Sequence, residues 1–399
     1  ITGAITQVRN EELLKRPVTS VTSALEGSTP GITVTGNYGS PGSDPTVLIR
    51  GIGTVNGSTS PLYVIDGVPY GGNISDLNME DIETMSILKD AASAALYGNR
   101  ASNGVILITT KKSKSERIQF NFKTNQGWYE RALPEYERTN PFQFMEVEYQ
   151  NAANAFVHGG GDRTDKQAIL NAVNSTLIPD RLYVNIFNKP DDQLFTLDGK
   201  MAADASIIDG YAGDLDWFDQ ATRKGYRSEY QFSGSGATSK SDYYFSLSYL
   251  DENGYMKDSG FDRLTGRMAV NIKPVKWLRA GMSINASHQK FQNTSNGVGD
   301  GSSSYSNPFY FCRYMAPIYP VHSHYTETGT VYDNAGTPIQ VNKGDYVLDG
   351  AGNPQWDGGS YIIYDQNGNP QEVITRNQNR DRHVIWESEL NDSRTIRNT

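Results

Sequence analysis

The chain has few of the residues that most often build disulfides, metal centres or basic surfaces. Its 399 residues include one cysteine, Cys312, and five histidines. A single cysteine excludes an internal disulfide framework and a thiolate metal cluster, so we interpret Cys312 as a small buried hydrophobe. The formal net charge of -9 argues against a general nucleic-acid binder, which needs clustered lysine and arginine.

Long apolar runs are missing as well. No stretch of about 18 consecutive apolar residues occurs, which excludes an ordinary transmembrane helix. This does not exclude membrane-spanning β-strands, because apolar and polar residues alternate along them and only half of their positions are apolar. The chain is 37% hydrophobic and contains 24 tyrosines and 39 glycines, a composition that suits such strands better than a large soluble core.

Motifs of known enzymes are not found either. There is no P-loop, no GxSxG and no HExxH. His322 and His324 form an isolated HxH pair, which is more often two loop histidines than a metal site. The Asp365, Asn367 and Asn369 segment resembles the start of a calcium loop, but its glycine is misplaced and we expect a turn. We therefore predict no catalytic residue, no metal and no cofactor.

What the sequence does contain begins with a compact unit. Residues 46–112 alternate short apolar runs with turn signals, in TVLIRGIG, PLYVIDGVPYGG and DIETMSILKDAASAALYGNRASNGVILITTKK. The pattern predicts short strands and a small helix in an α+β domain, with a hairpin turn at Asp66 and Gly67. The nearly all-apolar run GVILITT predicts a strand buried on both faces. We place this domain at residues 1–115.

From Arg117 onward the chain shows strict alternation. Apolar Ile118, Phe120 and Phe122 alternate with polar Gln119 and Asn121. Four more segments repeat the pattern near residues 226–233, 243–249, 263–272 and 278–287, and a weaker sixth lies near 383–390. Strands of about ten residues with one apolar face can cross a bilayer when tilted, although a soluble sandwich has the same period.

The connections between these strands alternate between long and short. Residues 129–225 and 291–382 are very long connections, whereas those near 237–241 and 273–276 are tight. All tight turns therefore fall at one end of the sheet, which is the asymmetry of outer-membrane barrels. We predict that residues 116–399 form the first part of a transmembrane β-barrel with large extracellular loops at about 129–225 and 291–382. In the first loop, Asn140 is expected to cap a helix that begins at Pro141.

Several of these motifs together resemble one family. LEGSTPGITVTG, TVLIRGIG, PLYVIDGVP and the SILKDAASAALYG and NGVILITTKK pair are similar to the plug domain of TonB-dependent outer-membrane transporters, in the SusC/RagA branch of Bacteroidetes-type bacteria. FCRYMAPIYP and RHVIWESEL also resemble that branch. The resemblance implies a membrane β-barrel of about 22 strands with the α+β plug inside it. Only about six strands are present here, so we expect the chain, which begins at Ile1, to be a processed or truncated piece of a longer protein.

The same resemblance implies a function in the bacterial outer membrane. It implies import of oligosaccharides, energised by the TonB-ExbB-ExbD complex, with a SusD-like surface lipoprotein as a lid and contact with outer-membrane lipid. A dimer of transporter-lid pairs is a further expectation, and import of peptides by the same class is an alternative. The residues themselves leave open a β-rich surface binding or adhesion protein that does not transport, and we expect no enzymatic activity.

The resemblance also implies residues that couple plug to barrel. Arg50, in LIRG, and Arg100, in YGNR, match plug arginines that pair with carboxylates of the barrel wall. Glu387 and Glu389 are candidates for those carboxylates within this chain.

Four residues are predicted to contact a ligand. They are Tyr38, Asn56, Tyr70 and Asn73. Aromatic and amide side chains beside glycine-rich turns suit either a sugar or a peptide, and loops of this kind often carry binding sites.

Overall fold

The structure is a computed structural model. It describes residues 5–15, 20–35, 41–42, 44–52, 59–89, 95–113, 115–130, 134–293, 308–333, 335–356, 360–364, 369–374 and 393–399. The chain divides into two compact units: the first comprises 1–131, 223–294 and 392–399, and the second comprises 132–222 and 295–391. Among the described residues, no helix has the length and apolar character needed to span a membrane.

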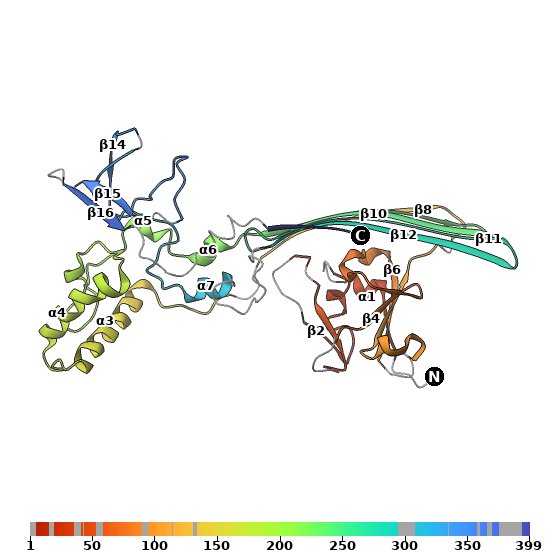
Figure 1. Cartoon of the computed structure of the whole chain (residues 1–399), viewed down its shortest axis with the longest axis horizontal. Helices are drawn as coiled ribbons and strands as arrows, with labels where there is room; N and C mark the ends of the chain where they lie inside the picture. Colours follow the sequence, from red (N-terminus) through yellow and green to blue (C-terminus); the bar gives the residue numbers. More distant parts are fainter. Residues whose placement is uncertain are drawn as a thin grey trace. The chain divides into compact units, whose positions relative to one another are not determined.

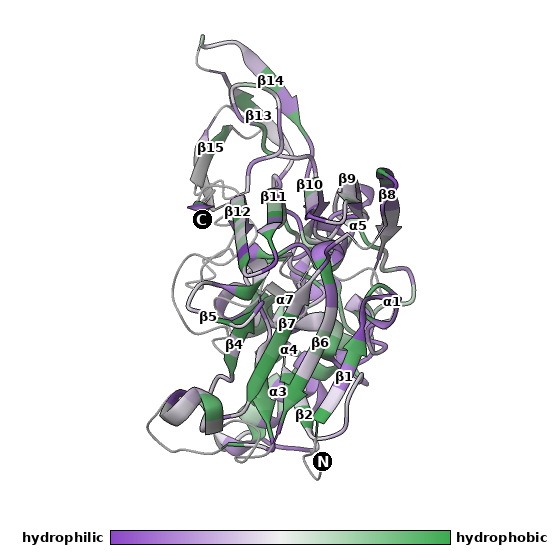
Figure 2. Cartoon of the chain, turned by 90° about the vertical axis from the view of Figure 1, so that its right-hand side faces the viewer, coloured by the Kyte–Doolittle hydropathy of each residue, from purple (hydrophilic) through white to green (hydrophobic). Residues whose placement is uncertain are grey.

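The first unit starts with a plug, whose centre is a five-stranded sheet of order β1-β6-β7-β4-β5 (Figure 1). Strand β4 pairs with β7 in parallel, and the other pairs are antiparallel. Val105, Ile106 and Ile108 of β7 are buried, as the apolar run predicted, and Figure 2 shows the hydrophobic colouring along β7. The strands are β1 (Ile5–Arg9), β4 (Leu62–Ile65), β5 (Val68–Tyr70), β6 (Ile82–Leu88) and β7 (Val105–Thr110).

Short helices and a second hairpin complete the plug. They enclose an apolar core that includes Leu13, Leu25, Met85 and Ile87. Asp66 and Gly67 both have positive φ, of 49° and 91°, as a type I′ hairpin turn requires. The remaining elements are α1 (Asn10–Leu13), η1 (Ser23–Leu25), β2 (Ile32–Thr35), β3 (Thr46–Ile49), η2 (Ile74–Asp76), η3 (Met79–Asp81) and η4 (Ala95–Ala101).

A long antiparallel sheet, which we call the wall, forms the rest of the first unit. Its order is β17-β12-β11-β10-β9-β8, and Figure 1 shows its long strands running together in a curved layer. Five strands lie where the alternation predicted them. The sixth strand observed is β17, whereas the segment predicted near 383–390 lies outside the described residues. The strands are β8 (Gln119–Tyr129), β9 (Gly225–Ala237), β10 (Ser241–Asn253), β11 (Gly260–Val275), β12 (Leu278–Asn293) and β17 (Ser393–Asn398).

The ends of the wall differ as the connection lengths predicted. Residues 238–240 and 276–277 make the two tight turns, at one end. Residues 254–259 join two strands at the other end, and the two long connections leave and rejoin the wall at that end, because each strand runs antiparallel to its neighbours.

Burial on the wall is the reverse of that in a soluble sandwich. Leu247 and Met282 have exposed fractions of 56% and 55%, whereas Arg263 is 2% exposed and Gln289 is inaccessible. A sheet that exposes its apolar face and buries its polar one fits an outer surface in contact with lipid. Other exposed apolar side chains of the wall are Phe120, Phe122, Phe232, Tyr249, Leu264, Met268, Ile272 and Ile284.

The second unit is a folded module. Asn140 caps α3 through a capping box with Gln143, whose backbone N–H donates to Asn140 Oδ1 at 2.8 Å. Cys312 is buried, and burial raises the pKa of its thiol to about 12, which agrees with its prediction as an inert core residue. The elements are α3 (Pro141–His158), α4 (Lys166–Thr176), η5 (Leu177–Leu182), η6 (Asp191–Gln193), α5 (Asp209–Ala212), α6 (Trp217–Ala221), α7 (Pro308–Tyr314), β13 (Gly329–Tyr332), β14 (Pro338–Val341), β15 (Ser360–Tyr364) and β16 (Pro370–Ile374).

Replacing Gly104, just before β7, is expected to destabilise the plug for a steric reason. Its φ is +89°, and an alanine Cβ would lie 2.8 Å from Ile49 Cδ1 and 3.2 Å from the Leu88 carbonyl oxygen. Gly67 has nearly the same φ, +91°, with nothing within 4 Å of the added Cβ. Both Gly→Ala variants should lose about 1 kcal/mol from the positive φ, and Gly104→Ala about 1–3 kcal/mol more from overpacking.

Urea unfolding of the plug, followed by hydrogen exchange of β6 and β7 peptides in detergent, measures this difference. Equal losses in the two variants would contradict the steric explanation.

Candidate functional site at the contact between plug and wall

Two buried side chains of the wall bind the backbone of the plug. Arg263 of β11 donates from Nη1 to the carbonyl oxygens of Ser75, at 2.9 Å, and Leu77, at 3.4 Å. Gln289 of β12 donates from Nε2 to the Ser75 carbonyl and to Asp76 Oδ1, both at 3.1 Å. The bonds to the Ser75 and Leu77 carbonyls depend on the path of the chain through η2 and not on plug side chains.

A second contact joins the wall to the hairpin turn of the plug. Arg267 Nη2 lies 2.5 Å from Thr110 Oγ1 and 3.4 Å from Asp66 Oδ2, while its Nη1 donates to Asn285 Oδ1 at 3.1 Å. Asp66 also accepts the Thr110 backbone N–H at 3.0 Å and the Thr110 hydroxyl. Burial alone would raise the pKa of Asp66, but the hydrogen bonds from Thr110 and the charge of Arg267 lower it.

Asp81, at the end of η3, forms the third contact. The Tyr244 hydroxyl of β10 donates to Asp81 Oδ1 at 2.7 Å. Burial raises the pKa of Asp81 in spite of hydrogen bonds from Ser246 and Tyr244. A cavity of about 20 Å³ adjoins this carboxyl, and Asn78 and Arg267 also line it. It has room for about one water molecule, a group that could satisfy the buried Asn78 Nδ2 and Arg267 Nε atoms.

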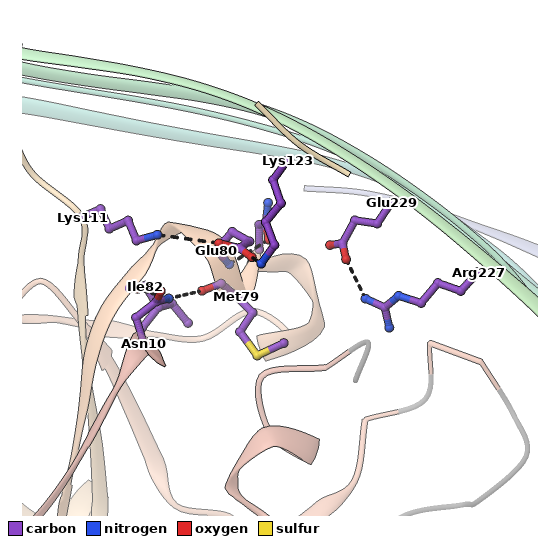
Figure 3. Close-up of polar contacts among 9 residues, drawn as sticks. Asn10, Met79, Glu80, Ile82, Lys111, Lys123, Arg227 and Glu229 are labelled. Carbon is purple, nitrogen blue, oxygen red and sulfur yellow. Dashed lines mark hydrogen bonds and ion pairs between the residues drawn. The ribbon is translucent and has the colours of Figure 1, made fainter. Parts of the chain in front are cut away.

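Glu80 fastens the segment that joins plug to wall (Figure 3). Lys111 lies just after β7, and Lys123 lies in β8, so the two flank the connecting residues. Lys111 Nζ is 3.7 Å from Glu80 Oε2, and Lys123 forms an ion pair with the other oxygen. Asn78 positions Glu80, because its side chain accepts the Glu80 N–H at 3.0 Å. One carboxylate thus holds both ends of the connection.

Figure 3 shows two further polar contacts of the first unit. Asn10 of α1 donates from Nδ2 to the carbonyl oxygen of Ile82, at 2.7 Å, and to that of Met79, at 3.3 Å. It therefore ties the N-terminal helix to the segment that carries Glu80. Arg227 donates to Glu229 at 2.9 Å, within β9 of the wall.

Comparison with known proteins shows which family the chain is similar to. A family model for the TonB-dependent Receptor Plug Domain matches residues 1–105. SusC of Bacteroides thetaiotaomicron is 29% identical over 364 residues, which cover 89% of this chain and 30% of that protein. A TonB-dependent receptor of Formosa agariphila is 29% identical over 306 residues, which cover 76% of this chain and 24% of that protein. Residues 1–105 therefore match a TonB-dependent receptor plug domain, and the chain is similar to SusC/RagA-type TonB-dependent receptors over most of its length.

Solved structures agree with this assignment at the level of the fold. The RagAB peptide importer in its closed-closed state superposes with a TM-score of 0.59 at 23% identity, over 89% of this chain and 36% of that chain. On the plug-domain match and the curated relatives together, the receptor is an outer-membrane protein with a plug and part of a β-barrel. It spans about a quarter to a third of the length of the curated relatives it matches.

Two of the predicted ligand residues of the receptor can be placed. Tyr70 ends β5, and its hydroxyl lies 3.2 Å from Asp76 Oδ2, while burial raises its pKa to about 12. Asn73 is exposed three residues later. Both therefore precede the η2 segment that Arg263 and Gln289 bind. Tyr38 and Asn56 lie outside the described residues, and ligand contact by all four stays a prediction.

The predicted coupling residues of the receptor are exposed where they are described. Arg50 has a left-handed φ of 61° and Arg100 lies in η4, both on the surface. Glu387 and Glu389 lie outside the described residues, so the pairing of these four stays a prediction.

The contacts that the receptor does show have the opposite polarity, with wall cations and plug acceptors. The alternation in residues 263–272 puts Arg263 and Arg267 on the polar face of their strand, but it does not predict which groups they contact. Both are long, charged side chains on a strand face that has to pack against the plug. Those two properties were the signal in the sequence that pointed to such a contact.

Removing the Arg267 guanidinium is expected to weaken the attachment of plug to wall. Arg267→Gln loses the contacts with Asp66 and Thr110 and should lower the free energy of unfolding of the plug by about 1–3 kcal/mol. Arg279→Gln, at an exposed position of β12, is the matched control. Urea titration monitored by hydrogen exchange of β4 and β7 peptides measures the effect. The same midpoint in both variants would refute the role of Arg267.

The Asp66 contact should make the attachment sensitive to acid. Because the pKa of Asp66 is lowered in the folded protein, its contribution is complete above the unfolded value of about 3.9 and is lost as pH falls through the lowered folded value. Other carboxyls titrate in the same range, so the test compares two proteins. Asp66→Asn should lose less plug protection than the native chain between about pH 5 and pH 2. Parallel acid profiles would count against it.

Proposed function

We propose that the receptor imports oligosaccharides across the outer membrane, energised by the TonB-ExbB-ExbD complex. The observation that carries this proposal is the polar contact between plug and wall. Arg263, Arg267 and Gln289 hold the plug through hydrogen bonds to backbone and carboxylate oxygens. A contact of this kind suits a plug that must shift to let a ligand pass.

Breaking this contact costs less free energy per interaction than opening the core of the plug. A hydrogen bond contributes about 0.5–1.5 kcal/mol net, and water can replace its partners when it breaks. Exposing one core side chain such as Met85 or Ile87 would cost about 1.5–3 kcal/mol. A pull on the plug would therefore separate it from the wall one bond at a time before its core opened.

The choice of oligosaccharide rests on what the resemblance to the SusC branch implies. SusC is among the relatives matched over most of this chain, and the exposed Asn73 offers an amide of the kind that hydrogen-bonds sugar hydroxyls. The alternative cargo is a peptide, because the solved RagAB structure is named a peptide importer. That neighbour is 23% identical and supports the fold, so sugar stays the first proposal.

Two partners belong to the proposal. A SusD-like surface lipoprotein would cover the end of the wall that bears the long connections, and a dimer of transporter-lid pairs would be the complete assembly. The non-transporting alternative, a surface binding or adhesion protein, would need neither a lid nor a polar, releasable plug.

Purification of the native receptor from outer membranes in detergent tests the proposal. Mass spectrometry of the co-purified chains and bound small molecules should find a lipoprotein and a glycan. A bound peptide mixture in place of the glycan would select the alternative cargo. Recovery of the receptor without a lipoprotein, together with unchanged uptake of labelled glycans in a deletion strain, would contradict the transport proposal.

A further inference from the structure

An apolar cluster interrupts the polar face of the wall, at the end away from the tight turns. It consists of Leu250, Phe261 and Phe291, all of them buried. Phe261 of β11 lies directly opposite Phe291 of β12, with ring centroids 4.8 Å apart. Phe261 is two positions from Arg263, and Phe291 is two positions from Gln289, so the cluster shares a face with these polar side chains. The apolar cluster therefore adjoins the polar contact with the plug.

Gly42 of the plug lies against this cluster. A Cβ added to Gly42 would be 2.2 Å from Phe261 Cδ2 and 2.4 Å from Phe261 Cγ. The residue is buried, and its φ of +73° is one that glycine adopts without strain. Both the close approach to the ring and the backbone conformation therefore require a residue without a side chain at this position.

Pro41 contacts the wall beside Gly42. A Cβ added to Gly254, which follows β10, would lie 3.1 Å from Pro41 Cγ and 2.0 Å from Ser259 Oγ. The Gly254 N–H donates to the Ser259 carbonyl oxygen at 2.9 Å, so the connection between β10 and β11 is tightly turned here. Pro41 is buried against this turn. Two successive plug residues thus pack where the wall has either a glycine or an aromatic ring.

Asp44 links this apolar contact to the polar one. Its Oδ2 accepts the Ser75 N–H of η2 at 3.2 Å. The carbonyl oxygen of Ser75 accepts hydrogen bonds from Arg263, at 2.9 Å, and from Gln289, at 3.1 Å. Ser75 is therefore bound through its N–H by the segment that carries Gly42, and through its carbonyl by the wall.

We propose that Pro41, Gly42 and Asp44 form a strap that holds η2 against the wall, and that η2 leaves Arg263 and Gln289 only after Gly42 has left Phe261. Water can replace the hydrogen bonds of the polar contact one at a time. An aromatic ring that becomes exposed gains no comparable replacement. The strap is therefore the step that resists gradual wetting of the contact. The inference concerns contacts inside the first unit and does not depend on what the receptor imports.

A reversible disulfide tests this order of release. One C–C bond separates Phe261 Cγ from its Cβ, so the Cβ atoms of a Gly42→Cys, Phe261→Cys pair would lie within about 4 Å, the range of a disulfide. The native Cys312 is buried and does not compete for oxidation. Mass spectrometry of the full chain in detergent should find the bond between the two introduced cysteines. Failure of the pair to oxidise would contradict the contact itself.

Hydrogen exchange of peptide 73–78, which contains η2, is the measurement. It is made in urea below the midpoint of plug unfolding, where local openings dominate. The oxidised pair should exchange this peptide about tenfold or more slowly than the same protein after reduction, whereas peptides of β9 and β10 should not change. Equal exchange of peptide 73–78 in the oxidised and reduced forms would overturn the proposal.

Asp44→Ala in the oxidised pair separates the strap from a general stabilising effect of the disulfide. This variant keeps the bond at Gly42 but removes the acceptor of the Ser75 N–H. Exchange of residues 76–78 should then return to the level of the reduced protein. Protection that persists without Asp44 would show that η2 is held by another route and would refute the strap.

Substitutions without a disulfide test the same contact by size. Gly42→Ala should speed exchange of peptide 73–78 about tenfold or more, because its Cβ displaces the strap from Phe261. Gly31→Ala is the matched control, with a φ of +77° and nothing within 4 Å of the added Cβ. Once Phe261→Ala has removed the ring, adding Gly42→Ala should have little further effect. Additive effects of the two substitutions would contradict the contact.

Discussion

The receptor's architecture depends on hydrogen-bond partners in the plug for polar side chains of the wall that become buried. Arg263 and Gln289 are almost inaccessible, and a charged or amide group in that position is costly unless it finds hydrogen-bond partners. The plug supplies them from the carbonyl oxygens of Ser75 and Leu77. Wall and plug are therefore chemically complementary, because donors of the wall and acceptors of the plug form hydrogen bonds that offset the cost of burying them.

The same constraint explains the reversed faces of the wall. Leu247 and Met282 are exposed on the side away from the buried polar groups, which would be unstable in water but is favourable against lipid. A soluble sandwich would pair its apolar faces and leave Arg263 and Arg267 in solvent. The two architectures therefore differ in which face of the sheet the plug covers. Here the hydrogen bonds between wall and plug favour covering the polar face.

The wall strands and the plug domain could be predicted from local patterns in the sequence. Period-two alternation and connection lengths located five wall strands, and Asp66 with Gly67 located the hairpin turn. The pairing of Arg267 with Asp66 could not be predicted, because it joins residues about two hundred positions apart and depends on strand register. For the same reason His322 and His324 were interpreted as ordinary loop histidines, since Asp214, which contacts both rings, is more than a hundred residues away.

The polar contact also determines how the plug and the wall can fold and separate. The plug has its own apolar core, in which Met85 and Ile87 pack among other plug side chains, and the wall adds hydrogen bonds to it. Glu80, held by Lys111 and Lys123, keeps the C-terminal end of the plug beside the first wall strand. Strand β1 is at the other end of the plug sequence, far from this connection. Among the described strands it pairs only with β6. A force applied to the N-terminal side would therefore act on an edge strand first, while the Glu80 contact keeps the other end in place. A plug held in this way would keep its register on the wall if such a force shifted it.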